Sequence, residues 1–234
     1  MQIQAVNNAP NFQANYLRIA QQAVKYGSHP ASSKIDIYSI DSRDKDLIEK
    51  LLVKTDLKPN RKDAAAVKEK NNINDTIRYI LNKALHLDEK SNDGVYIAVK
   101  NNKHLTGLLD FTNGSSPVLK NLISWRGNKD EATRSNLFAE FLRYIEKANN
   151  NRNWYSKVDI TAYSEPKTKG TRWLKENGFV LPEGSKASVR ERLVMEDDVI
   201  ASSRQKVEER LEAAGLKVNK NLKHSQVELK NLDL

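Results

Sequence analysis

The sequence predicts an α/β protein whose mixed sheet carries helices on both faces. Two observations lead to this prediction. Segments with apolar residues at helical spacing occur along the chain together with short segments of apolar–polar alternation, the pattern of strands. After a predicted hairpin that begins near residue 94, single helices separate single strands, an order that favours parallel neighbours in one sheet. The whole order is strand, helix, helix, three strands, helix, strand, helix and two strands.

The composition fits a folded protein of one or two domains, with 234 residues of which 38% are hydrophobic and 29% charged. The formal charge of +9 predicts attraction to something acidic, and nucleic acid, an anionic membrane surface and a phosphate-rich cofactor all qualify. Basic and acidic residues are interleaved, without the block of like charge typical of a nucleic-acid-binding tail. The absence of cysteine excludes disulfides and a thiol nucleophile, and four widely spaced histidines predict no metal site.

No apolar run approaches the roughly 18 residues of a membrane-spanning helix, and the first residues lack a secretory signal pattern. We therefore expect a cytoplasmic protein that does not enter the membrane. Three parts are predicted: an extension over 1–33, a main domain over 34–196, and a C-terminal helix and tail over 197–234. In the extension, apolar residues between Tyr16 and Val24 have helical spacing and predict a short helix. The turn-rich segment YGSHPASSK comes after this helix and is predicted to be a linker.

The main domain is expected to open with the strand KIDIYSI, in which isoleucines alternate with polar residues. A helix follows, with an apolar face between Leu47 and Leu52 and with Asp41 or Ser42 as a possible N-cap. The lysine-rich segment after it carries no clear pattern. The segment NDTIRYILNKALHL then predicts a second amphipathic helix, which begins at Asn74 or Asp75.

Two apolar runs around Asn101-Asn102, in GVYIAVKNNKHLTGLLDFTNG, have the spacing of a tight β-hairpin. The segment SPVLKNLISW is a third strand, whose alternation places Leu119 and Leu122 on opposite faces. A long helix with an acidic start and an apolar face follows in DEATRSNLFAEFLRYIEKANN.

The next strand, WYSKVDITAYS, leads to the helix TKGTRWLKEN, which ends at Gly178 and turns directly into Phe179 and Val180. A last alternating strand lies in SKASVRERLVMEDDV. The helix in SSRQKVEERLEAAG begins at a serine cap and ends at Gly215. The tail over 216–234 is polar and loosely held, although its spaced valines and leucines can dock on the domain or on a partner.

This order, together with the stretches LKNLISWRGNKDEATRSNLFAEFL and VDITAYSEPKTKGTRWLKENGF, resembles the GNAT superfamily of N-acetyltransferases over residues 34–196. The resemblance implies a mostly antiparallel central sheet of six to seven strands with a splayed parallel pair. It also implies that acetyl-CoA is the co-substrate, with its pyrophosphate at the N-terminus of the helix in the first stretch. A helix N-terminus suits that group because it offers free N–H groups and a positive dipole end.

The family's pyrophosphate loop reads Gln/Arg-x-x-Gly-x-Gly/Ala, and its spacing falls on Lys129, Ala132 and Arg134. The loop length is kept but both glycines are replaced. Glycine lets a phosphate approach the backbone closely, whereas Arg134 and Lys129 can supply direct positive charge instead. The resemblance further assigns cofactor contacts to the neighbours of these positions and to the end of the preceding strand. These residues are Thr133, Ser135, Ile123, Ser124 and Trp125.

The family's usual tyrosine, four residues before the Gly-Phe pair, is replaced here by Leu174. Tyr163, at the end of the preceding strand, is the nearest phenol that can protonate the departing thiolate; alternatively it is an ordinary strand-end aromatic. Asp110 and Asp159 are candidates for the base that takes the proton of the amine, and the alternative for each is a solvated surface acid. Proximity and orientation can suffice without a dedicated base.

Two functions follow from the resemblance. The first is a divergent N-acyltransferase that moves an acetyl group from acetyl-CoA to a primary amine on a small molecule or a protein. The alternative is a catalytically inactive module of the same fold that engages an acidic protein or nucleic acid. A nucleic-acid binder of another fold is disfavoured because the sequence has no helix-turn-helix signature and no platform of interleaved basic and aromatic residues.

Overall fold

The computed structural model describes residues 14–26, 29–58, 63–88, 91, 93–125, 131–151, 157–185, 189–219, 225–227 and 232–234. The described strands form one nine-stranded sheet in the order β7-β6-β5-β4-β3-β2-β1-β8, and β9 also pairs with β1. The strands are β1 (Ala14–Tyr26), β2 (His29–Ile40), β3 (Asp93–Lys100), β4 (His104–Thr112), β5 (Val118–Ser124), β6 (Ile160–Ser164), β7 (Glu191–Met195), β8 (Leu216–Asn219) and β9 (Ser225–Val227). The helices are α1 (Lys45–Lys54), α2 (Ala64–Leu85), α3 (Glu131–Asn150), α4 (Lys169–Glu176) and α5 (Asp197–Ala213).

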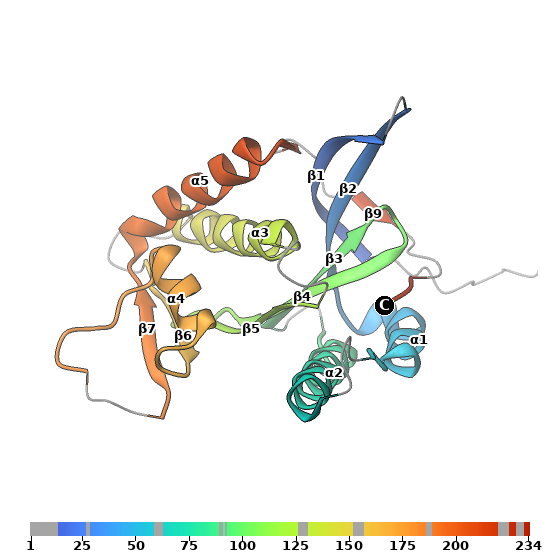
Figure 1. The fold of residues 1–234 in the computed structure, drawn as a ribbon. Helices are drawn as coiled ribbons and strands as arrows, with labels where there is room; N and C mark the ends of the chain where they lie inside the picture. Colours follow the sequence, from blue (N-terminus) through green and yellow to red (C-terminus); the bar gives the residue numbers. More distant parts are fainter. Residues whose placement is uncertain are drawn as a thin grey trace, which may run out of the picture.

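Helices cover both faces of the sheet, as predicted (Figure 1). On one face, α3, α4 and α5 pack over a core that includes Phe138, Phe141 and Phe179, all almost fully buried. On the other face, α1 and α2 cover a second core around Ile48 and Ile80. The named strands pair antiparallel except for β5 and β6, which are parallel. The mixed, mostly antiparallel sheet with one parallel pair is therefore confirmed, with more strands than the six or seven expected.

Local signals placed several elements correctly. Asn101 and Asn102 adopt φ angles of 53° and 58°, the left-handed conformation, in the tight three-residue loop that joins Lys100 of β3 to its pairing partner His104 of β4. The Asp41 side chain accepts a hydrogen bond from the Arg43 amide at 2.9 Å and caps the short 3₁₀ turn that leads into α1. The predicted end of α4 is also confirmed, because Gly178 has a φ of 97° directly after the helix.

The prediction of a helix within residues 14–26 is wrong, because this segment is strand β1. It pairs with β2 from Asn15 opposite Ser39 to Tyr26 opposite His29, and it pairs with β8 and β9 on its other side. Backbone pairing on both edges overrides the helical spacing of the side chains. The extension is therefore part of the sheet, and the residues of the predicted linker from His29 onward belong to β2.

Two helices begin earlier than predicted. Helix α2 starts at Ala64, where the Asp63 side chain accepts a hydrogen bond from the Ala66 amide at 2.8 Å. Asn74, one of the predicted caps, lies inside this helix, where its side chain accepts from the Leu57 amide and donates to the Leu57 carbonyl. Helix α5 starts at Asp197, five residues before the predicted serine cap, with two acidic residues in its first turn.

The C-terminal tail docks on the domain through its described residues. Strands β8 and β9 extend the sheet along β1, and Leu232 is 2% exposed in the core that faces α1 and α2. The Asp233 carbonyl accepts a hydrogen bond from the Leu105 amide at 2.7 Å, and its carboxylate lies 3.3 Å from the Lys54 ammonium. Of the alternatives left open for the tail, docking on the domain is the one observed.

Candidate cofactor-binding site

The sheet opens between β5 and β6. Val118 lies opposite Thr161 and Leu119 opposite Ala162, and the parallel pairing ends there. Strand β5 nevertheless continues on β4 as far as Ser124. From residue 120 onward its other edge therefore has no β6 partner, and such an edge presents backbone N–H and C=O groups that can pair with a ligand. This is the splayed parallel pair that the resemblance implies.

A β-bulge precedes the opening. The register between β4 and β5 shifts between Asp110 and Phe111, which leaves Lys120 without a paired residue on β4. Leu119 and Leu122 consequently both pack against the core beneath α3, whereas Ile123 packs on the opposite face. The prediction that Leu119 and Leu122 lie on opposite faces is therefore wrong. The extra residue of the bulge, Lys120, interrupts the alternation, so that both leucine side chains lie on the same face.

Helix α3 begins beside this open edge. Its first turn runs from Glu131 to Arg134, the segment onto which the pyrophosphate pattern falls, and the N–H groups of a first turn have no partner within the helix. The turn lies against β4 and β5: a Cβ built on Gly107 would meet the Thr133 methyl at 2.6 Å and the Ile123 carbonyl oxygen at 2.9 Å. Thr133 is accordingly fully buried beneath the helix start. The arrangement places the start of α3 next to the part of β5 that has no β6 partner.

Arg134 is held from the side by α4. Its guanidinium carbon lies 5.7 Å from the centroid of the Trp173 ring, within the range of a cation–π contact. Its Nε atom is buried and makes no hydrogen bond within the described residues. Trp173 also packs edge-on against Phe138 at 5.1 Å between centroids. An arginine so placed carries a charge near the first turn of α3 without an acidic partner on the described residues.

The other predicted cofactor residues differ in accessibility. Ser135 is 9% exposed, and Ala132 is half-buried against the core. Ser124 lies at the end of β5 and is half-buried. Trp125 is buried on the α2 side, where its carbonyl accepts a hydrogen bond from the Lys70 ammonium at 3.2 Å. Lys129 lies outside the described residues.

Tyr163 lies on β6 beyond the last residue that pairs with β5. It is 51% exposed and stands opposite Arg192 of β7. Its neighbours Ile160 and Ala162 pack in the core beneath α3, so Tyr163 is on the opposite face of the sheet by the alternation of a strand. The phenol is therefore accessible from the face that carries α1 and α2. Leu174, in the family's tyrosine position, is half-buried against the core.

Asp110 is fully buried on the α2 side of β4. Its carboxylate lies 3.2 Å from the Lys83 ammonium and accepts a hydrogen bond from the Asn121 amide at 2.7 Å. Lys83 in turn lies 2.9 Å from the Asp93 carboxylate. These contacts join α2 to β3, β4 and β5. The other candidate base, Asp159, is exposed, and its carboxylate accepts a hydrogen bond from the Asp197 amide at the start of α5.

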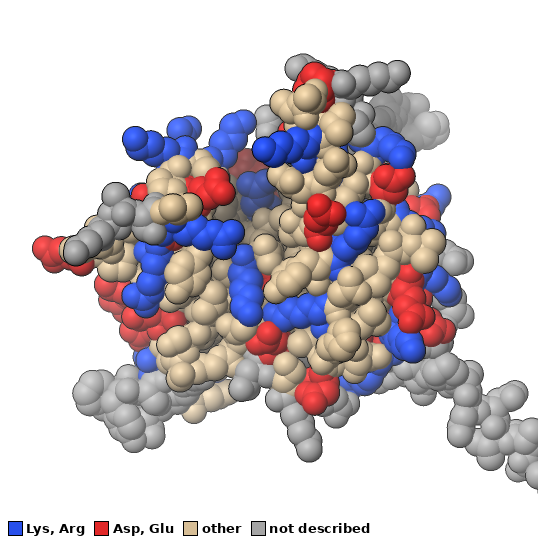
Figure 2. Space-filling view, turned by 90° about the horizontal axis from the view of Figure 1, so that it is seen from below, with Lys and Arg blue, Asp and Glu red and all other residues tan. Residues whose placement is uncertain are grey.

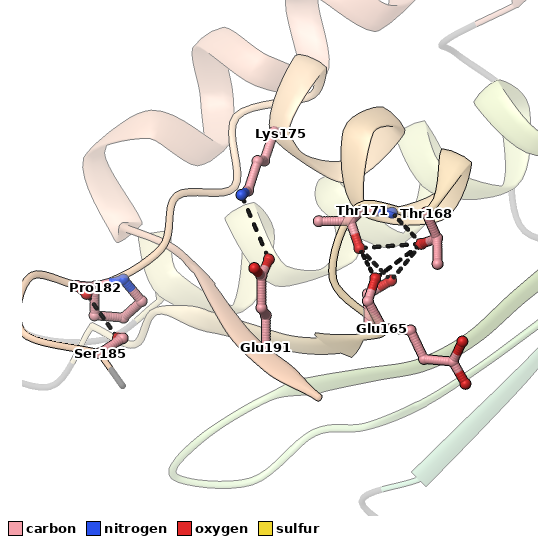
Figure 3. Close-up of polar contacts among 8 residues, drawn as sticks. Glu165, Thr168, Thr171, Lys175, Pro182, Ser185 and Glu191 are labelled. Carbon is pink, nitrogen blue, oxygen red and sulfur yellow. Dashed lines mark hydrogen bonds and ion pairs between the residues drawn. The ribbon is translucent and has the colours of Figure 1, made fainter. Parts of the chain in front are cut away.

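The turn from β6 into α4 is tied together by hydroxyl groups (Figure 3). Thr168 caps the helix by accepting from the Thr171 amide at 3.1 Å, and it donates to the Glu165 carbonyl at 3.0 Å. The Thr171 hydroxyl bridges the Ser164 hydroxyl and the same carbonyl. This network fixes where α4, and with it Trp173, stands beside α3. Three cations lie in this segment: Lys169 and Arg172 on α4, and Lys167 in the turn before it.

Positive charge is also visible on the face that carries α1 and α2. Figure 2, seen from below, shows Lys and Arg side chains gathered around a hollow near the middle of the view. Within the described residues, no helix is long and apolar enough to cross a membrane.

Sequence reasoning did not identify two residues that shape this site. Gly107 lies inside a predicted strand, which is a recognised signal that another backbone or side chain approaches closely. Trp173 carries no such signal, because its contact with Arg134 joins two helices separated by a strand and two loops.

No protein-family model matches the sequence, and neither does any curated protein. Similar solved structures include the PaiA N-acetyltransferase of Thermoplasma acidophilum in complex with coenzyme A, at 13% identity over 69% of this chain and 98% of that chain, with a TM-score of 0.46. A GNAT-family acetyltransferase of Staphylococcus aureus Mu50 has 15% identity over 70% and 99% of the two chains, with a TM-score of 0.47. A chimera of the Vibrio cholerae spermidine N-acetyltransferase SpeG has 13% identity over 71% and 98%, with a TM-score of 0.43. At these identities and TM-scores, no residue role or activity carries over to this chain.

Proposed function

We propose that this protein is an N-acetyltransferase that binds acetyl-CoA in the opening between β5 and β6. One observation carries the proposal: the parallel pairing ends at Leu119, whereas β5 runs on to Ser124 beside the first turn of α3. The pantetheine arm of acetyl-CoA contains two amides in a row, and these can pair with a free strand edge as an added strand would. The phosphates then lie at the start of the helix.

The loop before and within the first turn of α3 lacks the family's glycines, so we expect it to bind the phosphates of acetyl-CoA by other groups. The first N–H groups of α3 supply hydrogen bonds and the positive end of the helix dipole. Arg134 adds a full positive charge, which Trp173 holds near the helix start. Ala132 replaces a glycine with one methyl group and leaves the backbone accessible. Binding is therefore expected to depend more on ionic strength than in a site built from glycine amides alone.

In the proposed reaction, the nitrogen of a neutral primary amine attacks the thioester carbonyl carbon. A new C–N bond forms, the C–S bond breaks, and the products are an amide and the free thiol of CoA. A backbone N–H of β5 near Ile123 stabilises the oxyanion that forms on the carbonyl. The amine gives up one proton to solvent, the thiolate takes one from Tyr163, and the Tyr163 phenolate regains its proton from solvent. We leave Asp110 out of this step because its carboxylate is buried and held by Lys83 and Asn121.

The first experiment tests cofactor binding. Acetyl-CoA at about 1 mM is expected to raise the melting temperature by several degrees, because a ligand that binds only the native state stabilises it. Arg134→Glu should weaken binding at least tenfold by calorimetry. Lys50→Glu, the same change of charge at an exposed position on α1, is the matched control and should have no effect. An unmoved melting temperature, or equal effects of the two variants, would contradict the proposed site.

The second experiment tests chemistry. Release of free thiol from acetyl-CoA is followed with a panel of primary amines, including polyamines, amino sugars and lysine-containing peptides. Tyr163→Phe is expected to slow thiol release while acetyl-CoA affinity stays unchanged, and unchanged release would remove Tyr163 from the mechanism. Acetyl-CoA binding without thiol release for any amine would favour the alternative, a catalytically inactive module.

A further inference from the structure

A second cavity lies at the other end of α3, away from the opening between β5 and β6. Its volume is about 640 Å³, within the range of small-molecule pockets. It lies between the C-terminal half of α3 and the edge where β3 begins and β4 ends. The described residues that line it include Asp93, Tyr96, Phe111, Glu140, Tyr144 and Lys147.

The apolar wall of the cavity is a row of aromatic rings. The ring centroids of Tyr96 and Phe111 lie 5.2 Å apart, and those of Phe111 and Tyr144 lie 5.4 Å apart. Gly94 makes this row possible, because a Cβ at that position would lie 2.3 Å from the Phe111 ring. The Tyr144 hydroxyl accepts a hydrogen bond from the Asn113 amide at 2.7 Å, which fixes that ring. The wall is thus both apolar and rigid, the setting that a flat apolar ligand requires.

The charged side chains around the cavity differ in whether they already form an ion pair. The Asp93 carboxylate lies 2.9 Å from the Lys83 ammonium, and Glu140 lies 3.7 Å from the Arg143 guanidinium. Each of these two cations also faces a second carboxylate, that of Asp110 for Lys83 and that of Glu208 for Arg143. Lys147 is exposed, lines the cavity, and forms no ion pair within the described residues. Lys147 is therefore the lining cation that is available to an anionic group of a ligand.

A smaller hollow of about 380 Å³ adjoins the cavity, since Arg143, Lys147 and Asn151 line both. Arg204 on α5 borders this second hollow and is paired with Glu146 and Glu208. The neutral amides of Asn150 and Asn151 complete its rim. Lys147 thus lies between the aromatic wall of the cavity and the smaller, polar hollow beside it.

From this arrangement we infer that the cavity is a second binding site, independent of the proposed acetyl-CoA site, for a small ligand with a flat apolar body and one anionic group. The apolar body lies against Tyr96, Phe111 and Tyr144, and the carboxylate, sulfonate or phosphate of the ligand meets Lys147. The cavity and the first turn of α3 lie at opposite ends of the same helix, so occupancy of one leaves the other open.

The experiment uses the full chain and 1-anilinonaphthalene-8-sulfonate, a fluorescent aromatic anion. We expect saturable 1:1 binding that Lys147→Glu weakens at least tenfold and Ala148→Trp, which fills the cavity, abolishes. Lys50→Glu is the matched charge control and should change the affinity less than twofold. N-phenyl-1-naphthylamine has the same rings without the sulfonate, so it should bind more weakly and be indifferent to Lys147→Glu.

Each result decides the matter. Absence of saturable binding, or equal binding by the wild type and Lys147→Glu, would overturn the proposal. Equal affinity for the neutral probe would overturn its anionic part. Displacement of the probe by acetyl-CoA would show that both use one site and would overturn the independence, whereas failure of acetyl-CoA to bind anywhere leaves this test unaffected. If Ala148→Trp does not fold, Lys147→Glu alone still decides, because it changes an exposed side chain.

Discussion

The guanidinium of Arg134 lies over the ring of Trp173, with 5.7 Å between the guanidinium carbon and the ring centroid. This contact joins the first turn of α3 to α4, two elements that meet only in the folded protein. It gives Arg134 a fixed position in the absence of an acidic partner within the described residues, and it makes α4 part of the candidate site.

Loss of the Trp173 ring should therefore affect both stability and binding. Trp173→Leu removes the stacking on Arg134 and on Phe138, and we expect a loss of about 2–4 kcal/mol in the free energy of unfolding, together with weaker acetyl-CoA binding. Arg134→Met keeps the packing of the stem and should cost about 1 kcal/mol or less in stability while weakening binding. Denaturant unfolding and calorimetry measure the two effects, and a double-mutant cycle should give a coupling of about 1 kcal/mol. A coupling of zero would contradict the contact.

Gly107 should resist even the smallest substitution. A Cβ there would lie 2.6 Å from the Thr133 methyl and 2.9 Å from the Ile123 carbonyl oxygen, which is backbone and cannot rotate away. We expect Gly107→Ala to lower the free energy of unfolding by about 1–3 kcal/mol and to weaken acetyl-CoA binding, because it pushes α3 away from β5. Gly114→Ala is the control, since a Cβ at that position would have nothing within 4 Å, and its effect should stay within about 0.5 kcal/mol.

Two separate features of the structure require glycine at position 178. Its φ of 97° disfavours any side chain, and a Cβ would lie 2.2 Å from the Ser203 hydroxyl oxygen on α5. Gly184 has a φ of 74° with open space around it, so Gly184→Ala isolates the conformational cost, about 1 kcal/mol. Gly178→Ala should cost more than that, and the added change Ser203→Ala should recover only the steric part. Equal unfolding midpoints for Gly178→Ala and Gly184→Ala would contradict this prediction, because they would mean that α5 shifts to accommodate the added methyl group.

Asp44 should make stability fall as the pH rises. Burial raises the pKa of its carboxyl to about 6, and the hydrogen bond from the Asp41 amide opposes this only in part. The folded protein therefore holds the proton more tightly than the unfolded chain. The contribution of Asp44 is fully present below pH 4 and is lost as the pH rises through about 6, by roughly 3 kcal/mol.

Asp44→Asn keeps an acceptor for the Asp41 amide but cannot ionise. The variant should unfold at a higher temperature than the wild type at about pH 7.5 and show no advantage at about pH 4.5. Asp46→Asn, an exposed acid in the first turn of α1, is the control and should be slightly destabilising at neutral pH because it loses a favourable dipole interaction. A constant difference between wild type and Asp44→Asn across this range would refute the raised pKa.

The ion pair of Lys83 with Asp110 should matter for stability more than for the acetyl transfer step. Lys83→Met leaves two carboxylates, those of Asp110 and Asp93, without their cation, and we expect a loss of about 3–5 kcal/mol. Adding Asp110→Asn to Lys83→Met should recover part of the loss. If Asp110→Asn alone abolished thiol release while the protein stayed folded, Asp110 would return as a candidate base.

Local chemistry accounts for what the sequence predicted well. The Asn101-Asn102 hairpin, the end of α4 at Gly178 and the apolar face of α3 each depend on residues within a few positions of one another. The cofactor segment was likewise placed by its spacing from the strand before it, and the structure puts Ala132, Thr133 and Arg134 in one helical turn beside the open strand edge. Whether those residues hold a phosphate stays a prediction.

The tertiary structure decided the features that depend on distant partners. Residues 14–26 have helical spacing yet form β1, because β2, β8 and β9 offer backbone partners on both edges. The bulge at Lys120 depends on how β4 and β5 match in length, which no single strand specifies. The burial of Asp110 and the stacking of Arg134 depend on helices far away in the chain. The sequence by itself thus determined the local turns, the end of α4 and the order of the elements from β2 to α4. Only packing between segments far apart decided which side chains meet, because the energy of each such contact requires both partners to be in place.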